Sequence, residues 1–248
     1  LDALYRAAGL HVVEVDEVVV HDDQGQTVEH RTLVARRARV GIYCNYVTGG
    51  WDPADRASLN GSELSVVRVA EQWAADGHEV EVWQNGATVA RHNGVTYRAR
   101  ELPITTDLDL LVTFKTLERI ETAARARVYW SVDLPTPTPA EFLPPRVVPD
   151  LDAILCVSEW HRQRVADACP WVPPEKLKAH WLGVDPVEIV AACGGTPHKM
   201  YYAVYASSLD RGLRPLLEMW PQIKERVPTA TLRVLYGWDF WKRAEAIV

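Results

Sequence analysis

The sequence predicts an α/β fold in which helices cover both faces of a mostly parallel sheet. Two observations support this prediction. From Arg39 onward, short and mostly apolar runs, of the kind buried in parallel sheets, alternate with segments of helical periodicity. Prolines, glycines and helix-capping residues stand at the boundaries between these segments. Such alternation is typical of consecutive βαβ units, in which a helix connects two parallel strands.

The clearest βαβ unit begins with the apolar run 40–45, which predicts a buried strand near the centre of the sheet. Residues 62–75 follow as an amphipathic helix with its apolar positions on one face. Asn60 or Ser62 can cap the start of this helix. The run 78–83 is the next expected strand, so the unit is complete.

The same alternation continues through the rest of the chain. Further strands are expected at 108–114, 127–131, 153–157, 178–182, 201–206 and 231–236, and helices at 117–124, 159–168 and 213–226. The prolines between 135 and 139 predict an extended loop without a helix, and the stretch 187–199 has the composition of a linker. Because ligands of such sheets bind at the carboxyl ends of the strands, the loops after the strands are the places for a site.

Residues 1–37 have a different pattern. A short helix over 1–9 and a β-hairpin formed by 11–20 and 28–35 are expected. The stretch AGLHVVEV, the hairpin and TLVARR resemble the last elements of a class I methyltransferase sheet. No glycine-rich S-adenosylmethionine loop precedes them, so an extra hairpin on the main domain is the alternative interpretation.

Composition limits the classes of function. The length of 248 residues suits one large or two smaller domains, and the 48% of hydrophobic residues is close to the globular average. A net charge of −6 argues against nucleic acid as a partner, because backbone binding needs a basic face. No apolar run approaches the roughly 20 residues that cross a bilayer, and no secretory signal is visible. The four cysteines lack disulfide or metal spacing, so a cytoplasmic location is expected.

Several motifs in chain order resemble GT-B glycosyltransferases of the family 4, glycogen-synthase-like type. They are the Gly49-Gly50 loop, NGSELSVVRVAEQWAADGHEVEVW, LCVSEWHRQRV, LGVD and YASSLDRGLRPLLEMWPQIKERVPTATLRVLYGW. The resemblance covers about residues 38–248 and implies two Rossmann-like domains. Residues 38–195 would form the N-terminal, acceptor-side domain, and 196–248 the first part of the nucleotide-sugar-binding domain.

The resemblance implies a glycosyltransferase of the hexosyltransferase type. It would move a sugar from a nucleotide-diphosphate donor to a hydroxyl acceptor (a glycan, lipid or protein) with retention of configuration. No cofactor besides the donor substrate and no metal are expected. Many GT-B enzymes neutralise the diphosphate with a glycine-rich loop, a helix N-terminus and basic side chains. A peripheral membrane contact and the oligomeric state stay open.

The donor-binding residues that the resemblance implies are Gly49, Gly50, Glu63, Ser158 and Arg211. The two glycines would let backbone N–H groups approach a phosphate, and a plain surface turn is their alternative role. Arg211 stands where the family often has a lysine, and its guanidinium offers a bidentate fork for phosphate oxygens. Its alternative role is a solvated charge at a helix start. Ser158 is first of all a helix N-cap.

Asp133 is the catalytic residue that the resemblance implies, as an acceptor-side carboxylate beyond a strand end. Related enzymes often have a His-Asp pair here, but Val132 takes the place of the histidine, and a loop cap is the alternative role of Asp133. Lys115, directly after a strand, and His161 are weaker candidates.

The later acidic motif of the family does not occur before Val248, so the sequence looks cut at its C-terminus. The chain alone is therefore expected to show no transferase turnover. The alternative function is a non-catalytic Rossmann-like module that binds an acceptor or acts as a scaffold. A nicotinamide-dependent oxidoreductase is disfavoured, because no G-x-G-x-x-G follows the first strand of the sheet.

Overall fold

The computed structural model describes most of the chain. The described residues are 15–21, 27–33, 37–44, 50–56, 59–85, 89–104, 107–118, 123–135, 137–184, 186–193, 201–207 and 211–235. The chain forms two compact units, Leu1–Gly183 and Val184–Val248. The domain boundary expected at 195/196 stays a prediction.

An antiparallel hairpin lies near the N-terminus. Strands β1 (Val15–His21) and β2 (Thr27–Leu33) pair from Val15 opposite Leu33 to His21 opposite Thr27. This confirms the expected hairpin, while the helix expected over 1–9 lies outside the described residues. The methyltransferase resemblance stays a prediction.

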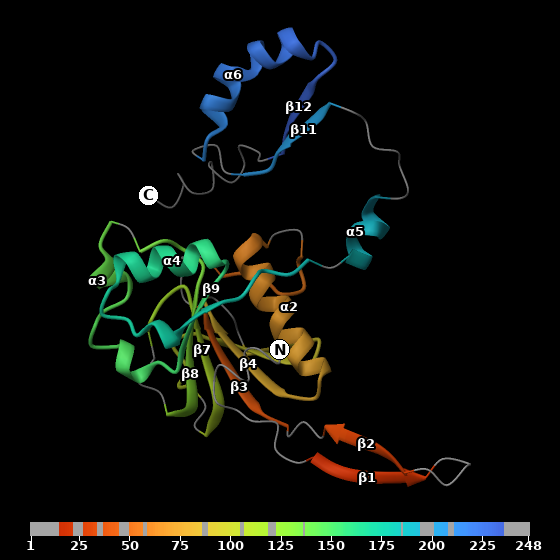
Figure 1. Ribbon diagram of the computed structural model, residues 1–248, viewed down its shortest axis with the longest axis vertical. Coiled ribbons are helices and arrows are strands. Elements are labelled where there is room, and N and C mark those ends of the chain that lie inside the picture. Colours follow the sequence, from red (N-terminus) through yellow and green to blue (C-terminus); the bar gives the residue numbers. More distant parts are fainter. Residues whose placement is uncertain are drawn as a thin grey trace. The chain divides into compact units, whose positions relative to one another are not determined.

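The centre of the first unit is an eight-stranded sheet with the order β10-β9-β8-β7-β3-β4-β6-β5 (Figure 1). All neighbouring strands are parallel except β5 and β6. The strands are β3 (Arg39–Cys44), β4 (Glu79–Gln84), β5 (Ala90–His92), β6 (Val95–Ala99), β7 (Leu108–Phe114), β8 (Ala124–Ser131), β9 (Ala153–Cys156) and β10 (Leu177–Ala179). Because β3 pairs in parallel with both β4 and β7, its predicted central position is confirmed.

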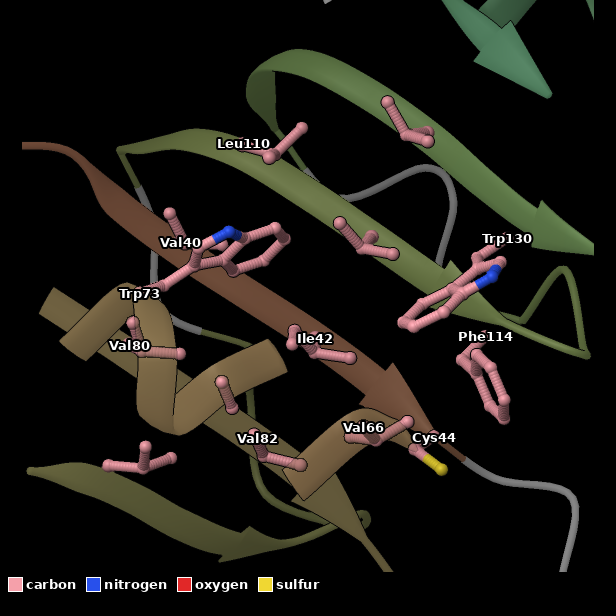
Figure 2. Packing of buried hydrophobic residues seen from close by; sticks show 14 of the residues in the cluster. Val40, Ile42, Cys44, Val66, Trp73, Val80, Val82, Leu110, Phe114 and Trp130 are labelled. Carbon is pink, nitrogen blue, oxygen red and sulfur yellow. The ribbon is translucent and has the colours of Figure 1, made fainter. Parts of the chain in front are cut away.

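Helix α2 (Gly61–Ala75) covers one face of this sheet. Its buried residues Val66, Val67 and Trp73 pack against β3, β4 and β7, as Figure 2 shows in part. Leu64, one of the apolar positions of the predicted helix, is only half buried. The helix ends before Gly77, whose φ of +94° is a conformation that suits glycine.

The opposite face carries a second core under helix α4 (Glu159–Ala168). Along β8 the side chains alternate: Val128 and Trp130 belong to the core under α2, and Tyr129 to the core under α4. Each core contains free, buried cysteines, which are Cys44 under α2, and Cys156 and Cys169 under α4. Helices therefore cover both faces of the sheet, as predicted.

Several local expectations were wrong. The proline-rich loop contains a short helix α3 (Pro139–Phe142), because a proline in the first turn of a helix costs no hydrogen bond. It is followed by the 3₁₀ turns η1 (Val148–Asp150) and, after α4, η2 (Pro174–Lys176). The helix expected over 117–124 is not formed at its described ends, since Leu117 is not helical and Ala124 begins β8.

The β5–β6 hairpin was not predicted. Its turn consists of Asn93 and Gly94, both at positive φ (45° and 83°). An Asn-Gly pair in this conformation is the usual two-residue connection of antiparallel strands.

The second unit contains one βαβ unit, as predicted. Strands β11 (Tyr202–Tyr205) and β12 (Thr231–Val234) are parallel neighbours, and helix α6 (Leu213–Arg226) connects them. The linker expected over 187–199 is instead helical in α5 (Pro186–Cys193). None of the described helices combines the length and apolar character that crossing a bilayer requires.

Candidate functional site

The topology of the sheet selects one edge as the place for a ligand. The strands that follow β3 in the chain, β4 and β6, lie on one side of it, and β7, β8, β9 and β10 lie on the other. The strand order thus reverses between β3 and β7. In open α/β sheets, ligands bind outside the carboxyl ends of the strands at such a switch point.

Lys115 lies at this switch point, directly after β7. Its φ of +64° is left-handed, a conformation that costs a non-glycine residue about 1–3 kcal/mol. Two hydrogen bonds hold it there: its N–H donates to the carbonyl of Trp130 (3.1 Å), and its own carbonyl accepts the hydroxyl of Tyr129 (3.1 Å). A strained residue that its neighbours hold in place is typical of a functional site.

Lys115 forms an ion pair with Asp133, which follows the end of β8. The Nζ atom lies 3.1 Å from Oδ2 of Asp133. The lysine side chain is only 18% exposed, whereas that of Asp133 is 58% exposed. The carboxylate is therefore the member of the pair that a ligand can reach.

His161, on the first turns of α4, connects Asp133 to the end of β9. Its Nε2 lies 2.9 Å from the backbone carbonyl of Asp133, and its Nδ1 accepts the N–H of Val157 at 3.2 Å. The Oγ of Ser131 lies 3.5 Å from the same Nε2. Burial lowers the pKa of His161, and the carbonyl and charge of Asp133 only partly oppose this shift.

Ser158 caps α4, as predicted. Its Oγ accepts the N–H of His161 at 3.0 Å. The cap therefore joins the same cluster as Asp133, with His161 as the link. A donor-binding role of Ser158 stays a prediction.

Trp51, between β3 and α2, is held by the neighbouring strands. The Nε2 of Gln84, at the end of β4, donates to the carbonyl of Trp51 (2.9 Å), and the indole of Trp51 meets the ring of Tyr97 edge to face. Gly50 precedes Trp51 and is exposed, so its backbone is accessible to a ligand. Gly49 lies outside the described residues.

Glu63 binds Asn60, one of the two residues that the sequence offered as the cap of α2. Its carboxylate accepts the backbone N–H of Asn60 (3.0 Å) and the side-chain amide of Asn60 (2.9 Å), which completes a capping box at the start of α2. The cap at Asn60 is thus confirmed. Burial raises the pKa of the Cys44 thiol, and the charge of the buried Glu63 side chain raises it further. Its donor-binding role stays a prediction.

Arg211 belongs to the second unit. It is exposed and directly precedes Gly212, the N-cap residue of α6, whose φ is +97°. Its contact with a donor diphosphate stays a prediction.

The structure thus brings Asp133 and Ser158 together through His161 and adds Lys115 and Ser131. Sequence reasoning missed Ser131, although it is the last residue of a strand and stands two positions before Asp133. Within the described ranges, no group of three or more His, Cys, Asp and Glu side chains could hold a metal ion.

No family model and no curated protein matches the sequence. Solved structures do resemble its fold. An α,α-trehalose 6-phosphate synthase from Burkholderia multivorans has a TM-score of 0.51 and 14% identity, covering 86% of this chain and 66% of its own. A sucrose-phosphate synthase from Thermosynechococcus elongatus has a TM-score of 0.54 and 16% identity, covering 79% and 62%. An α,α-trehalose-phosphate synthase (UDP-forming) from Burkholderia vietnamiensis has a TM-score of 0.53 and 13% identity, covering 80% and 64%.

These enzymes have the GT-B architecture. The chain has a GT-B-type fold. The predicted fold class, a Rossmann-like sheet with part of a second Rossmann-like domain, is confirmed. The chain spans less than two thirds of the length of each of these GT-B enzymes. The family 4 type stays a prediction.

Proposed function

We propose that the protein is a glycosyltransferase that moves a sugar from a nucleotide-diphosphate donor to a hydroxyl acceptor. The observation that carries this proposal is the Lys115–Asp133 ion pair at the switch point of a GT-B-type sheet. Both the fold and the position of the pair suit a sugar nucleotide and its acceptor.

Asp133 is the residue that we assign to the acceptor. With Oδ2 facing Lys115, its other carboxylate oxygen can accept a hydrogen bond from the acceptor hydroxyl. Lys115 holds the carboxylate in place and supplies a positive charge near the reacting oxygen. Positioned charges of this kind lower the barrier when charge develops during transfer.

The donor side rests on the residues that the family resemblance implies. Arg211 would bind the diphosphate, and Gly49, Gly50, Glu63 and Ser158 are the other donor-binding residues that this resemblance implies. We propose transfer of a hexose with retention of configuration, as the family resemblance implies. We also propose that no metal is needed, because a guanidinium and backbone N–H groups can neutralise a leaving diphosphate.

Nucleotide binding tests the donor side. We expect saturable binding of UDP or GDP in isothermal titration calorimetry, and a weaker affinity in Arg211→Ala by about 1.5–3 kcal/mol, the worth of a charged hydrogen bond. That loss is about tenfold or more in Kd. Arg214→Ala is the matched control, since Arg214 lies on α6 and pairs with Glu218 on the same helix.

Three outcomes would contradict the donor assignment. Equal losses in Arg211→Ala and Arg214→Ala would reject the role of Arg211. Absence of binding by both nucleotides would favour the non-catalytic module. Binding of NADH in their place would favour the oxidoreductase.

A further inference from the structure

We propose that His161 is a positioning residue: its neutral, Nε2-protonated tautomer holds the Asp133 turn so that the carboxylate faces Lys115. The inference rests on the proposed function only for the role of Asp133 toward an acceptor. The contact of His161 with the backbone of Asp133 follows from hydrogen bonds within the first unit.

The surroundings of the ring determine where its proton lies. At Nδ1 the neighbour is the backbone N–H of Val157, 3.2 Å away, which can only donate. Nδ1 must therefore carry a lone pair. In a neutral imidazole the other nitrogen then carries the proton, so Nε2 donates to the carbonyl of Asp133 at 2.9 Å.

This bond is shorter than the one that Ser131 donates to the same carbonyl. The Oγ of Ser131 also donates to that carbonyl, but at 3.4 Å. The carbonyl and the carboxylate belong to the same residue, so fixing the carbonyl limits where the carboxylate can reach. On the opposite side, Lys115 is held by its strained backbone and its two hydrogen bonds. His161 therefore fixes one partner of the ion pair while β7 and β8 fix the other.

The same argument excludes a role of His161 as a general base. Both ring nitrogens are engaged with backbone groups, and the residue is only 3% exposed. A ligand at Asp133 would find no free lone pair on this histidine. His161 acts through Asp133 and not on a substrate.

Two substitutions separate the two bonds of the ring. In His161→Asn the amide oxygen takes the position of Nδ1 and can accept from Val157, but the side chain is too short for Asp133. In His161→Gln the amide nitrogen takes the position of Nε2 and can donate to the Asp133 carbonyl. If the hold on Asp133 matters, Gln preserves the ion pair and Asn does not.

The experiment is NMR spectroscopy of the whole chain, without any sugar nucleotide. Long-range ¹H–¹⁵N spectra of the wild type at neutral pH should show an unprotonated Nδ1 and a protonated Nε2 for His161. Removal of the Asp133 carboxylate in Asp133→Asn should shift the side-chain signal of Lys115, which is assigned by Lys115→Arg. We expect this signal to keep its wild-type position in His161→Gln and to move to its Asp133→Asn position in His161→Asn.

Several results would overturn the inference. One is the opposite tautomer or a protonated ring in the wild type. This measurement does not depend on whether any variant folds. Another is a Lys115 side-chain signal that keeps its wild-type position in His161→Asn. Because no readout uses a nucleotide, these results are independent of whether UDP or GDP binds.

Discussion

Two buried histidines in this chain are held in the same way. His78 accepts the N–H of Ala38 at Nδ1 (3.2 Å), as His161 accepts that of Val157. A protonated Nδ1 would place one N–H against another, and burial already disfavours the charge. Burial is the main cause that lowers the pKa of both rings, while Asp76 and Asp133 oppose it from beside His78 and His161.

These lowered pKa values predict how stability depends on pH. Below the ordinary histidine pKa of 6.5, these two histidines bind protons in the unfolded chain but stay neutral in the native state until the pH is lower. The stability that the neutral rings contribute is therefore complete above that pH and is lost as the pH falls through the lower native values. Urea unfolding between about pH 7 and pH 5 should show this loss, and His161→Gln should reduce it. If the stability of His161→Gln depends on pH as that of the wild type does, the His161 ring has the same pKa in the native and unfolded chains.

Local and long-range features of the site differ in how well sequence predicts them. Ser158 could be predicted, because a cap depends on a residue and the next turn of its own helix. The pair Lys115–Asp133 spans two strand ends, and the contact between His161 and Asp133 joins a helix to a loop 28 residues away. Such contacts depend on the order of the strands in the sheet, which the alternating pattern leaves undetermined.

Among the elements, helix α2 has the most strongly specified start. Two hydrogen bonds join Asn60 and Glu63, and a third runs from the N–H of Ser62 to the side chain of Asn60. The cap therefore contributes to the stability of α2.

Asn60→Ala should destabilise the chain by about 0.5–2 kcal/mol, the usual cost of losing an N-cap. Chemical denaturation monitored by circular dichroism measures this loss. Gln72→Ala is the control, because Gln72 is exposed on the same helix and its side-chain amide donates to Asp76 at the opposite end of the helix from the cap. Equal free energies of unfolding in both variants would show that the capping box adds no stability.

The elements that sequence reasoning misjudged have physical causes. The Asn93-Gly94 turn is a strong hairpin signal, but strands of 3 and 5 residues are too short to show alternation. At Pro139 the general rule that proline breaks helices was applied where the first-turn exception holds. In α5, the alanine- and valine-containing segment forms a helix although it is bounded by proline and glycine.

At the scale of the whole molecule, the two units differ in how much side chain they bury. The first unit has cores on both faces of its sheet. In the second unit, α6 has no buried residue, and every described residue of β11 and β12 is at least partly exposed. The alternating pattern predicted the elements of both units, but it carries no information on how much each one buries.

Native-state hydrogen exchange should show this difference. Backbone amides of β3 and β7 should exchange only through global unfolding, with opening free energies in the usual range of about 5–15 kcal/mol. Amides of α6 and β12 should open at free energies close to zero, because few apolar contacts oppose their opening. Similar protection in both units would contradict this prediction.

The buried thiols give the first unit a built-in measure of its own opening. Burial raises the pKa of Cys156 to about 12 and that of Cys169 to about 11, and it raises that of Cys44 as well. A protonated, enclosed thiol reacts very slowly with alkylating reagents, so each cysteine becomes labelled only when its surroundings open. Cys44 lies on the α2 side of the sheet, and Cys156 and Cys169 lie on the α4 side. The order in which they are alkylated thus records which layer of the sheet separates first.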